Sequence, residues 1–342
     1  MGFVQPLYSR SAIDAAGHTY VLPPSPEARE QALAIINNWR SAHSYPLNTW
    51  QTNLRRTIPK FDTEPTVAQR IKRLPSIRQK LERFPDMKLS RMQDLGGCRA
   101  VVADVATLNA VVDHYVSSSR AKHRLIRQDY YVLDPPSSGY RGTHLVYAYN
   151  SDRNTHWNGL RIEMQIRSQL QHGWATAVET VGTFTKQALK SSQGADVWLR
   201  FFALMSSALA IREGTPCVPG TPENPADLGK ELRKSVKKLD VVDRLQAYGT
   251  ALRHAEQQAS EYKGQTFLME LDIADKTLSL KSYNDVAVAA DQYSALERAT
   301  EGDPTKDVVL VSVDSLAALR RAYPNYFLDT SAFVASVREA IQ

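Results

Sequence analysis

Two acidic residues in the middle of the chain stand in surroundings that favour metal-assisted chemistry. Asp94 comes just before Gly96–Gly97 and an apolar run, and a carboxylate at the mouth of a strand can bind Mg²⁺, which prefers oxygen ligands. Glu163 lies where polar and apolar residues alternate, so a strand would place the polar ones on a single face. These polar residues are Arg161, Glu163, Gln165 and Arg167. Simpler interpretations stay open: Asp94 caps a turn, and Glu163 lies on an edge strand with a solvated face.

A basic cluster precedes Asp94. Lys72, Ser76 and Lys80 are spaced by four residues, and in a helix from about 67 to 83 they would share one face that could line a triphosphate. Pro75 inside this stretch predicts a kink or a boundary. The planar guanidinium of Arg70 could stack on a base, and Arg99 could contact phosphate oxygens. The alternative for the cluster is a solvated amphipathic helix.

A glycine-rich loop follows at residues 138–144, with the sequence Ser-Gly-Tyr-Arg-Gly-Thr-His. Its two glycines allow the backbone to approach a ligand closely, and Tyr140 offers a ring for stacking. The alternative is a surface turn with an exposed tyrosine. Further along, His172, Trp174 and Glu179 fall on a predicted helix that could support the face of Glu163.

These candidate residues require helices and strands in alternation to position them. Apolar stripes at helical spacing predict helices at about 26–57, 67–83, 105–118, 169–185 and 195–212. Shorter apolar runs predict strands at 98–103, 130–133, 144–149 and 161–166. We therefore expect an α+β (mixed α/β) catalytic domain with a mixed sheet flanked by helices.

The last part of the chain shows a different pattern. A loop rich in proline and glycine at 213–226 leads into a long charged helix predicted at 226–262. Alternating residues at 267–280 predict a β-hairpin, followed by a helix near 285–300, a strand at 308–311 and two short helices. We divide the chain into a catalytic domain at 1–262 and a small C-terminal α/β domain at 263–342.

Composition limits the classes of function. The net charge of +6 conceals an uneven distribution, because residues 1–250 hold 33 basic and 22 acidic residues whereas residues 251–342 hold 9 and 14. A basic body suits polyphosphate or RNA, although a merely solvated basic face is equally consistent, and the acidic end could dock onto it. The only two cysteines, Cys98 and Cys217, cannot form a disulfide framework or a thiolate zinc site, so we expect no zinc. Since we see neither a membrane-spanning run nor a secretory signal, we expect a cytoplasmic protein without a membrane partner.

Taken together and in this order, the clusters resemble the RelA/SpoT synthetase family over roughly residues 30–200. The Arg-x-Lys-x-x-x-Ser-x-x-x-Lys element is similar to the ATP-binding motif of that family. Asp94, with Arg99 five residues later, resembles the family's metal-binding aspartate and the arginine that follows it. The resemblance implies that Asp94 and Glu163 are catalytic and hold Mg²⁺. It implies ATP binding by Arg70, Lys72, Ser76, Lys80 and Arg99. It implies acceptor binding by Tyr140, Arg141, His144, Gln165 and Arg167.

The resemblance also implies a reaction. The family transfers the β,γ-pyrophosphate of ATP to a ribose 3′-hydroxyl, with the glutamate as a candidate general base. The chain contains no His-Asp dipeptide, so the metal-dependent hydrolase half of the family is expected to be absent and the enzyme to be synthesis-only. A catalytically silent nucleotide- or RNA-binding module is the alternative from another class.

The end of the chain bears on the acceptor. Tyr323 and Tyr326 form a Tyr-x-x-Tyr element that resembles the one in CapRel-type fused toxin–antitoxins, where a C-terminal pseudo-zinc-finger blocks ATP binding until a phage protein is sensed. That branch implies the 3′-CCA end of tRNA as acceptor and a role in antiviral defence, whereas GDP or GTP is the usual acceptor of the family. The alternative is that the two tyrosines simply pack between short helices.

Overall fold

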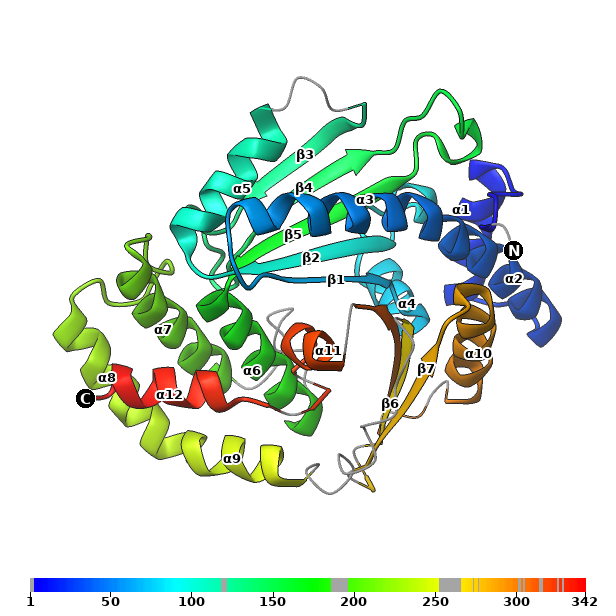
Figure 1. The fold of residues 1–342 in the computed structure, drawn as a ribbon. Helices are drawn as coiled ribbons and strands as arrows, with labels where there is room; N and C mark the ends of the chain where they lie inside the picture. Colours follow the sequence, from blue (N-terminus) through cyan, green and yellow to red (C-terminus); the bar gives the residue numbers. More distant parts are fainter. Residues whose placement is uncertain are drawn as a thin grey trace.

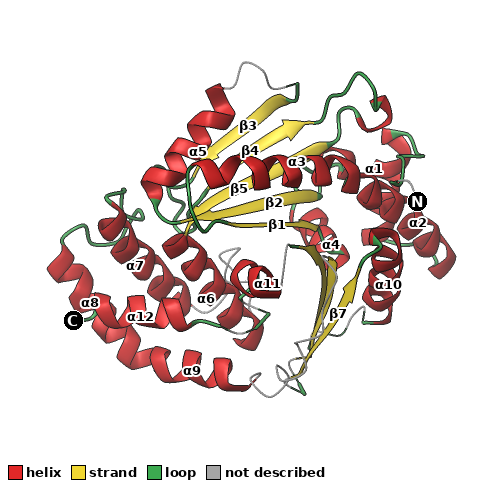
Figure 2. Ribbon diagram, in the orientation of Figure 1, coloured by secondary structure: helices red, strands yellow, loops and turns green. Residues whose placement is uncertain are grey.

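The computed structural model describes residues 3–117, 122–185, 196–251, 266–272, 274–275, 277–300, 303, 305–313, 316–324, 326–327 and 329–342. Within them, a mixed sheet of eight strands in the order β3-β4-β5-β2-β1-β8-β6-β7 is flanked by helices (Figures 1 and 2). The predicted α+β class with a mixed sheet flanked by helices is confirmed.

Five neighbouring strands form the part of the sheet around the candidate residues, of which Arg70, Arg99, His144, Glu163, Gln165 and Arg167 lie on strands. The five strands are β1 (Thr66–Ile71), β2 (Gly96–Val102), β3 (Arg124–Tyr130), β4 (Thr143–Ala148) and β5 (Arg161–Ser168). The central pair, β2 and β5, runs parallel and places Gly97 opposite Glu163, while the other neighbouring strands run antiparallel. One side of these strands packs against α3 (Ser44–Thr57) and α5 (Val105–Ser117) in an apolar core that includes Leu54, Val111 and Ile166. The other side is left for polar residues.

Two helices expected as single units are divided in the structure. The predicted helix 26–57 is α2 (Pro26–Ala42) followed by α3, because Pro46 in the first turn of α3 cannot donate to Ala42 and would clash with its carbonyl. The predicted helix 226–262 is α8 (Pro225–Leu239) and α9 (Val241–Ala251), separated by Asp240 with a φ of 50°. Residues 252–262 of that prediction lie outside the described residues.

Other predicted elements shift their type or position. The predicted helix 67–83 is wrong in its first part: Thr66–Ile71 form β1, and α4 (Leu74–Arg83) begins only at the turn that contains Pro75. The strand expected at 130–133 lies earlier, as β3, and the strand expected at 98–103 begins already at Gly96, as β2. Helix α1 (Arg10–Val21) was not predicted. The predicted helices at 105–118, 169–185 and 195–212 correspond to α5, α6 (Gln169–Thr185) and α7 (Asp196–Glu213), apart from Ser118 and Ala195, which are not described.

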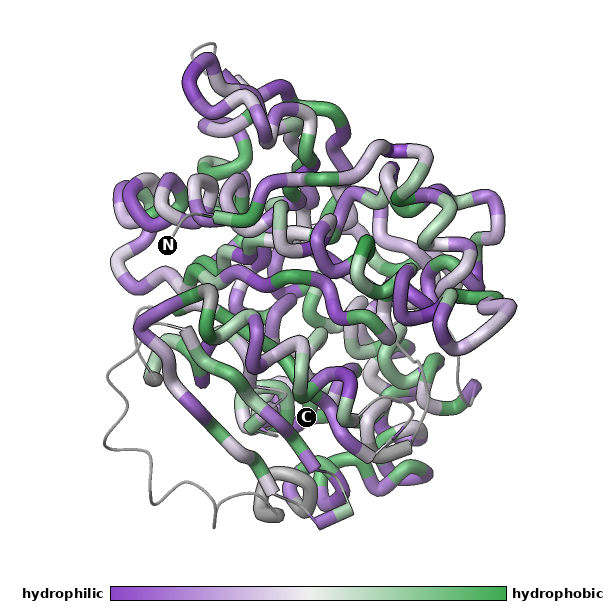
Figure 3. Tube along the Cα trace, turned by 90° about the vertical axis from the view of Figure 1, so that its right-hand side faces the viewer, coloured by the Kyte–Doolittle hydropathy of each residue, from purple (hydrophilic) through white to green (hydrophobic). Residues whose placement is uncertain are grey.

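The C-terminal elements are β6 (Thr266–Asp272), β7 (Thr277–Tyr283), α10 (Val286–Ala299), β8 (Lys306–Ser312), α11 (Leu316–Ala322) and α12 (Ser331–Ala340). The predicted hairpin is confirmed as β6–β7. Strand β8 pairs with β6 and also with β1, where Ser312 and Val311 lie opposite Gln69 and Arg70. Helix α12 packs into the apolar cluster of α6–α9 through Phe333, Val334 and Val337. Among the described residues no helix is long and apolar enough to cross a membrane, and the hydrophobic stretches of the trace are short (Figure 3).

Candidate active site

The two candidate carboxylates face one small cavity. Asp94 lies in the segment before β2, and Glu163 lies on β5. Together they line a cavity of about 40 Å³ on the polar side of the sheet. The remaining lining residues are Arg70, Lys72, Gly97, Cys98, Arg99, Gln165 and Tyr323.

Asp94 is held between two lysines. Its Oδ2 accepts from Lys72 Nζ and its Oδ1 from Lys80 Nζ, both at 2.9 Å. Burial opposes ionisation, but the two ammonium groups outweigh it and lower the pKa of Asp94 below its ordinary value. Lys72 lies in the β1–α4 connection and not on a helix face shared with Ser76 and Lys80, which are one turn apart on α4. The two lysines therefore converge on Asp94 from different elements.

Glu163 is bound from two sides. Its Oε1 lies 3.0 Å from His144 Nδ1, and its Oε2 accepts from Gln165 Nε2 at 2.7 Å. Burial would raise its pKa, but the charge and hydrogen bond of His144 lower the pKa of Glu163 to about 2. For His144, burial is outweighed by Tyr140 and Glu163, and its pKa rises to about 9. The histidine is therefore a cation paired with Glu163 at neutral pH.

The glycine–tyrosine loop closes a circuit around Glu163. The Tyr140 hydroxyl lies 2.6 Å from His144 Nε2 and accepts from Arg167 Nη2 at 2.9 Å. Arg167 also donates to Gln165 Oε1 at 3.1 Å, and its guanidinium lies over the Tyr140 ring at 5.2 Å. Glu163, Gln165, Arg167, Tyr140 and His144 thus form a closed ring of polar contacts.

Glycine is required where this loop turns. Gly139 has a φ of 84°, and a Cβ there would lie 2.9 Å from Ser206 Cβ and 3.2 Å from the Phe202 carbonyl oxygen. Arg141 takes no part in the ring: its guanidinium is buried and donates to Ser206 Oγ at 2.9 Å and to the Val132 carbonyl at 3.1 Å. The loop therefore presents Tyr140 to the site and directs Arg141 into the body of the protein.

The C-terminal segment reaches into the same site. Tyr323 and Tyr326 are each 2% exposed. The Arg99 guanidinium lies 5.2 Å from the centre of the Tyr323 ring and donates to the Ala322 carbonyl at 3.0 Å. The Tyr323 hydroxyl donates to the Gln69 carbonyl at 3.4 Å, and Arg73 donates to the Tyr326 hydroxyl at 3.3 Å. Both tyrosines thus contact the segment that holds the basic cluster.

The size of the cavity follows from this arrangement. Pockets for drug-sized ligands have volumes of roughly 300–1,000 Å³. With Tyr323 in place, the cavity of about 40 Å³ beside Asp94 is too small for a nucleoside triphosphate.

A metal ion can be assessed from the donor set. The described residues contain no group of three or more His, Cys, Asp or Glu side chains suited to hold one. Two carboxylates facing one cavity nevertheless fit Mg²⁺, which keeps several waters and is commonly bound by one or two carboxylates together with substrate phosphates. Asp94 and Glu163 meet that requirement.

Some residues at the site gave no signal in the sequence. Arg40, on α2, donates from Nε to the Lys72 carbonyl at 3.0 Å, and Glu297, on α10, accepts from the Leu74 amide at 2.6 Å. Arg40 and Glu297 are 257 positions apart, so no sequence pattern links them. Arg73 directly follows Lys72, and the density of basic residues there could have suggested it.

Comparison with known proteins adds the family. Residues 69–186 match a family described as the region found in RelA/SpoT proteins. The chain is 30% identical over 112 residues to the GTP pyrophosphokinase YjbM of Bacillus subtilis (strain 168). The aligned stretch covers 32% of this chain and 52% of the relative. The chain thus matches about half the length of this curated relative.

Solved structures are similar over half of the chain. Small alarmone synthetases 1 and 2 of Bacillus subtilis are 22% and 19% identical, with TM-scores of 0.41 and 0.42, and cover 50% and 51% of this chain and 90% and 94% of their own chains. A GTP pyrophosphokinase family protein of Streptococcus pneumoniae is 24% identical, with a TM-score of 0.41, and covers 50% of this chain and 86% of its own. The family match spans the candidate residues from Arg70 to Arg167. The chain therefore contains a region, residues 69–186, that is similar to the region found in RelA/SpoT proteins.

Proposed function

We propose that the chain is a pyrophosphokinase that transfers the β,γ-pyrophosphate of ATP to a ribose 3′-hydroxyl. The bond between the β-phosphorus and the oxygen that bridges it to the α-phosphate breaks, and that oxygen leaves with AMP. The 3′-oxygen forms a bond to the β-phosphorus and loses its proton. One observation carries the proposal: Asp94 and Glu163 face a single cavity rimmed by cations, within the region that matches the RelA/SpoT family.

The donor side follows from the cations. Asp94 and Glu163 would hold Mg²⁺, which neutralises charge on the transferred phosphates. Lys72 and Lys80, which bind Asp94 in this structure, would then exchange that contact for phosphate oxygens. Arg70 and Arg99 would receive the adenine and the phosphates once Tyr323 leaves. Ser76 would add a hydroxyl one turn before Lys80.

The acceptor side follows from the ring around Glu163. A pKa of about 2 keeps Glu163 ionised, as a metal ligand must be, and makes it a weak base while His144 donates to it. A role as general base therefore requires the acceptor to draw His144 away from Glu163. Tyr140, which Arg167 covers on one face, would stack on the acceptor's base, and Gln165 would contact the acceptor as well.

The acceptor we propose is the 3′-CCA end of tRNA. This rests on the Tyr-x-x-Tyr element, which resembles that of CapRel-type proteins and whose tyrosines lie buried against Arg99 and Arg73. In this proposal the segment excludes ATP until a trigger, expected to be a phage protein, displaces it. A guanosine nucleotide is the second candidate, favoured by the relative named as a GTP pyrophosphokinase. The division at residue 262, the synthesis-only activity, the pseudo-zinc-finger character and the role in antiviral defence stay predictions.

The test is a transfer of label. The full chain with Tyr323→Ala and Tyr326→Ala is incubated with [γ-³²P]ATP, Mg²⁺ and either bulk tRNA or GDP. We expect label in tRNA, none in tRNA whose 3′-terminal diol has been oxidised by periodate, and none with Glu163→Gln added. Label in GDP alone would select the second candidate. Label in neither acceptor would reject the pyrophosphokinase and leave a nucleotide- or RNA-binding module.

A further inference from the structure

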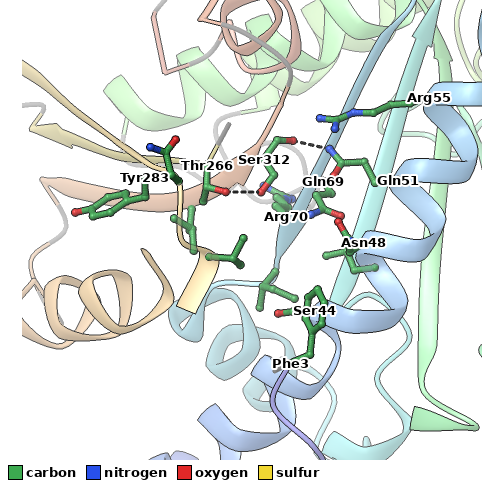
Figure 4. Close-up of a pocket in the computed structure, with 15 residues that line it drawn as sticks. Phe3, Ser44, Asn48, Gln51, Arg55, Gln69, Arg70, Thr266, Tyr283 and Ser312 are labelled. Carbon is green, nitrogen blue, oxygen red and sulfur yellow. Dashed lines mark hydrogen bonds between the residues drawn. The ribbon is translucent and has the colours of Figure 1, made fainter. Parts of the chain in front are cut away.

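A second and larger cavity lies between α3, β1 and the C-terminal strands. Its volume is about 330 Å³, within the range of ligand-binding pockets. Figure 4 shows that one wall comes from α3 and β1, with Asn48, Gln51 and Gln69, and the other from the C-terminal strands, with Thr266 and Ser312. The chain thus builds this cavity from residues 44–71 and 266–312, together with Phe3.

The charged residues of the lining are basic, which favours an anionic ligand. Arg55 and Arg70 line the cavity, and none of its lining residues is acidic. A guanidinium presents a planar set of donors that matches phosphate oxygens. Figure 4 places Arg55 at one end of the cavity and Phe3 at the opposite end, so a ligand would have its charged group near Arg55.

The neutral part of the lining suits a planar polar ring. Four carboxamides line the cavity, and Phe3 and Tyr283 contribute aromatic rings; the carboxamides are Asn48, Gln51, Gln69 and Asn284. Gln51 is fixed, since its Nε2 donates to the Ser312 carbonyl at 2.7 Å. The side-chain amides of Asn48 and Asn284 also line the cavity, and a carboxamide offers both a donor and an acceptor to the edge of a nucleobase.

We propose that this cavity binds a mononucleotide, with its phosphates at Arg55 and its base among the carboxamides and aromatic rings. The site is separate from the catalytic cavity, although Arg70 lines both. A nucleotide here is a ligand and not a substrate, because neither Asp94 nor Glu163 lines this cavity.

The position of the cavity gives such a ligand an effect. Among the described residues β1 pairs with β8 at Gln69 and Arg70, and Gln51 donates to the Ser312 carbonyl, so the two walls meet at these contacts. A ligand bound to both walls favours the arrangement in which they are joined. In that arrangement Tyr323 donates to the Gln69 carbonyl and lines the catalytic cavity, which is then too small for a nucleoside triphosphate. The nucleotide therefore holds the enzyme inactive, and this consequence, unlike the binding itself, rests on the proposed function.

Binding is tested by calorimetry on the full chain, with ADP, GDP and inorganic pyrophosphate as separate probes and no tRNA present. We expect one molecule of ADP or GDP to bind per chain, and pyrophosphate to bind at least about tenfold more weakly, because it lacks the ring. The melting temperature should rise with the concentration of the nucleotide that binds.

Variants locate the site. Arg55→Gln removes the charge, and Asn48→Trp fills the cavity from an exposed position on α3; each should weaken nucleotide binding about tenfold or more. Thr52→Trp, on an exposed position of the same helix outside the lining, and Lys80→Ala, which removes a partner of Asp94, should leave it unchanged. The inference is overturned if neither nucleotide binds, if pyrophosphate binds as tightly as the nucleotides, or if Lys80→Ala abolishes binding and Asn48→Trp does not. None of these outcomes depends on pyrophosphate transfer.

Discussion

At the scale of single residues, both candidate carboxylates already carry cationic partners from the same chain. Asp94 lies between Lys72 and Lys80, and Glu163 is paired with His144. A carboxylate buried without such a partner would be strongly destabilised. The partners therefore keep the site charge-balanced without substrate, and in the proposed reaction Mg²⁺ with ATP would have to replace these contacts. Activity then depends on how readily the lysines and the histidine exchange partners.

His172 should give the protein a specific sensitivity to acid. Its Nε2 donates to the Arg321 carbonyl at 2.9 Å, and burial, with Arg99 and Arg167 nearby, lowers its pKa to about 3. A histidine with a lowered folded-state pKa contributes stability that is present above pH 6.5 and is lost as the pH falls towards 3. Between pH 7 and pH 5 we expect it to remove about 2 kcal/mol from the free energy of unfolding.

Urea unfolding at the two pH values measures this loss. His172→Gln keeps a donor for the Arg321 carbonyl but does not titrate. Between pH 7 and pH 5, the free energy of unfolding of this variant should therefore fall by about 2 kcal/mol less than that of the wild type. His43, whose pKa burial lowers to about 4, titrates in both proteins and cancels in the comparison. Equal losses in the two proteins would show that His172 does not cause the sensitivity.

At the scale of elements, a buried polar network joins α10 to α2 and α4. Arg40 and Glu297, which are 3% and 4% exposed, form an ion pair at 3.0 Å. Tyr293 donates to Glu297 Oε1 at 3.0 Å, and the same oxygen accepts from the Leu74 amide at the start of α4. Arg40 also holds the Lys72 carbonyl. The C-terminal part therefore fixes the segment between β1 and α4 from which Lys72 reaches Asp94.

Glu297→Ala should destabilise the protein by about 3–5 kcal/mol, because it leaves Arg40 buried without its partner and the Leu74 amide without its acceptor. Glu82→Ala is the matched control, since Glu82 pairs with Arg78 on α4 with both side chains more than 40% exposed. The control should cost about 0.5 kcal/mol or less. Denaturant unfolding compares the two, and similar losses would contradict the role assigned to the network.

The same scale shows what the sequence could predict. Local signals were sufficient for α5, α6 and the β6–β7 hairpin, where apolar residues recur at the helical or strand period. They failed at Thr66–Ile71, because the spacing of Lys72, Ser76 and Lys80 suggested one helix although only the last two lie on it. The order of the motifs grouped Lys72, Lys80, His144 and Gln165, which contact Asp94 and Glu163, but also Arg141, which points away from them; the roles of these residues stay predictions. The pairing of β8 with β1 and of Arg40 with Glu297 depends on tertiary contacts, for which a single sequence has no pattern.

At the scale of the whole molecule, the acidic C-terminal part contacts the basic body at several points. Asp307 forms an ion pair with Arg73, and Glu297 forms one with Arg40. Between these contacts, Tyr323 and Tyr326 pack in an apolar cluster that includes Phe267, Leu319 and Phe327. The two oppositely charged parts of the chain are thus in contact, and in this arrangement Tyr323 lies against Arg99 and Tyr326 against Arg73.

Removing both rings should therefore release the catalytic cavity. Tyr323→Ala with Tyr326→Ala removes the ring that lies against Arg99 and one of the two partners of Arg73, and we expect the rate of pyrophosphate transfer to rise about tenfold or more as the open population grows. Expression of this variant should also slow cell growth. Phe327→Ala is the control, because Phe327 lies in the same cluster and under Arg320, and its loss weakens the packing without removing a ring from Arg99. If the control raises the rate as much as the double variant, loosening of the C-terminal part is sufficient. If neither variant raises it, the tyrosines do not limit the entry of ATP.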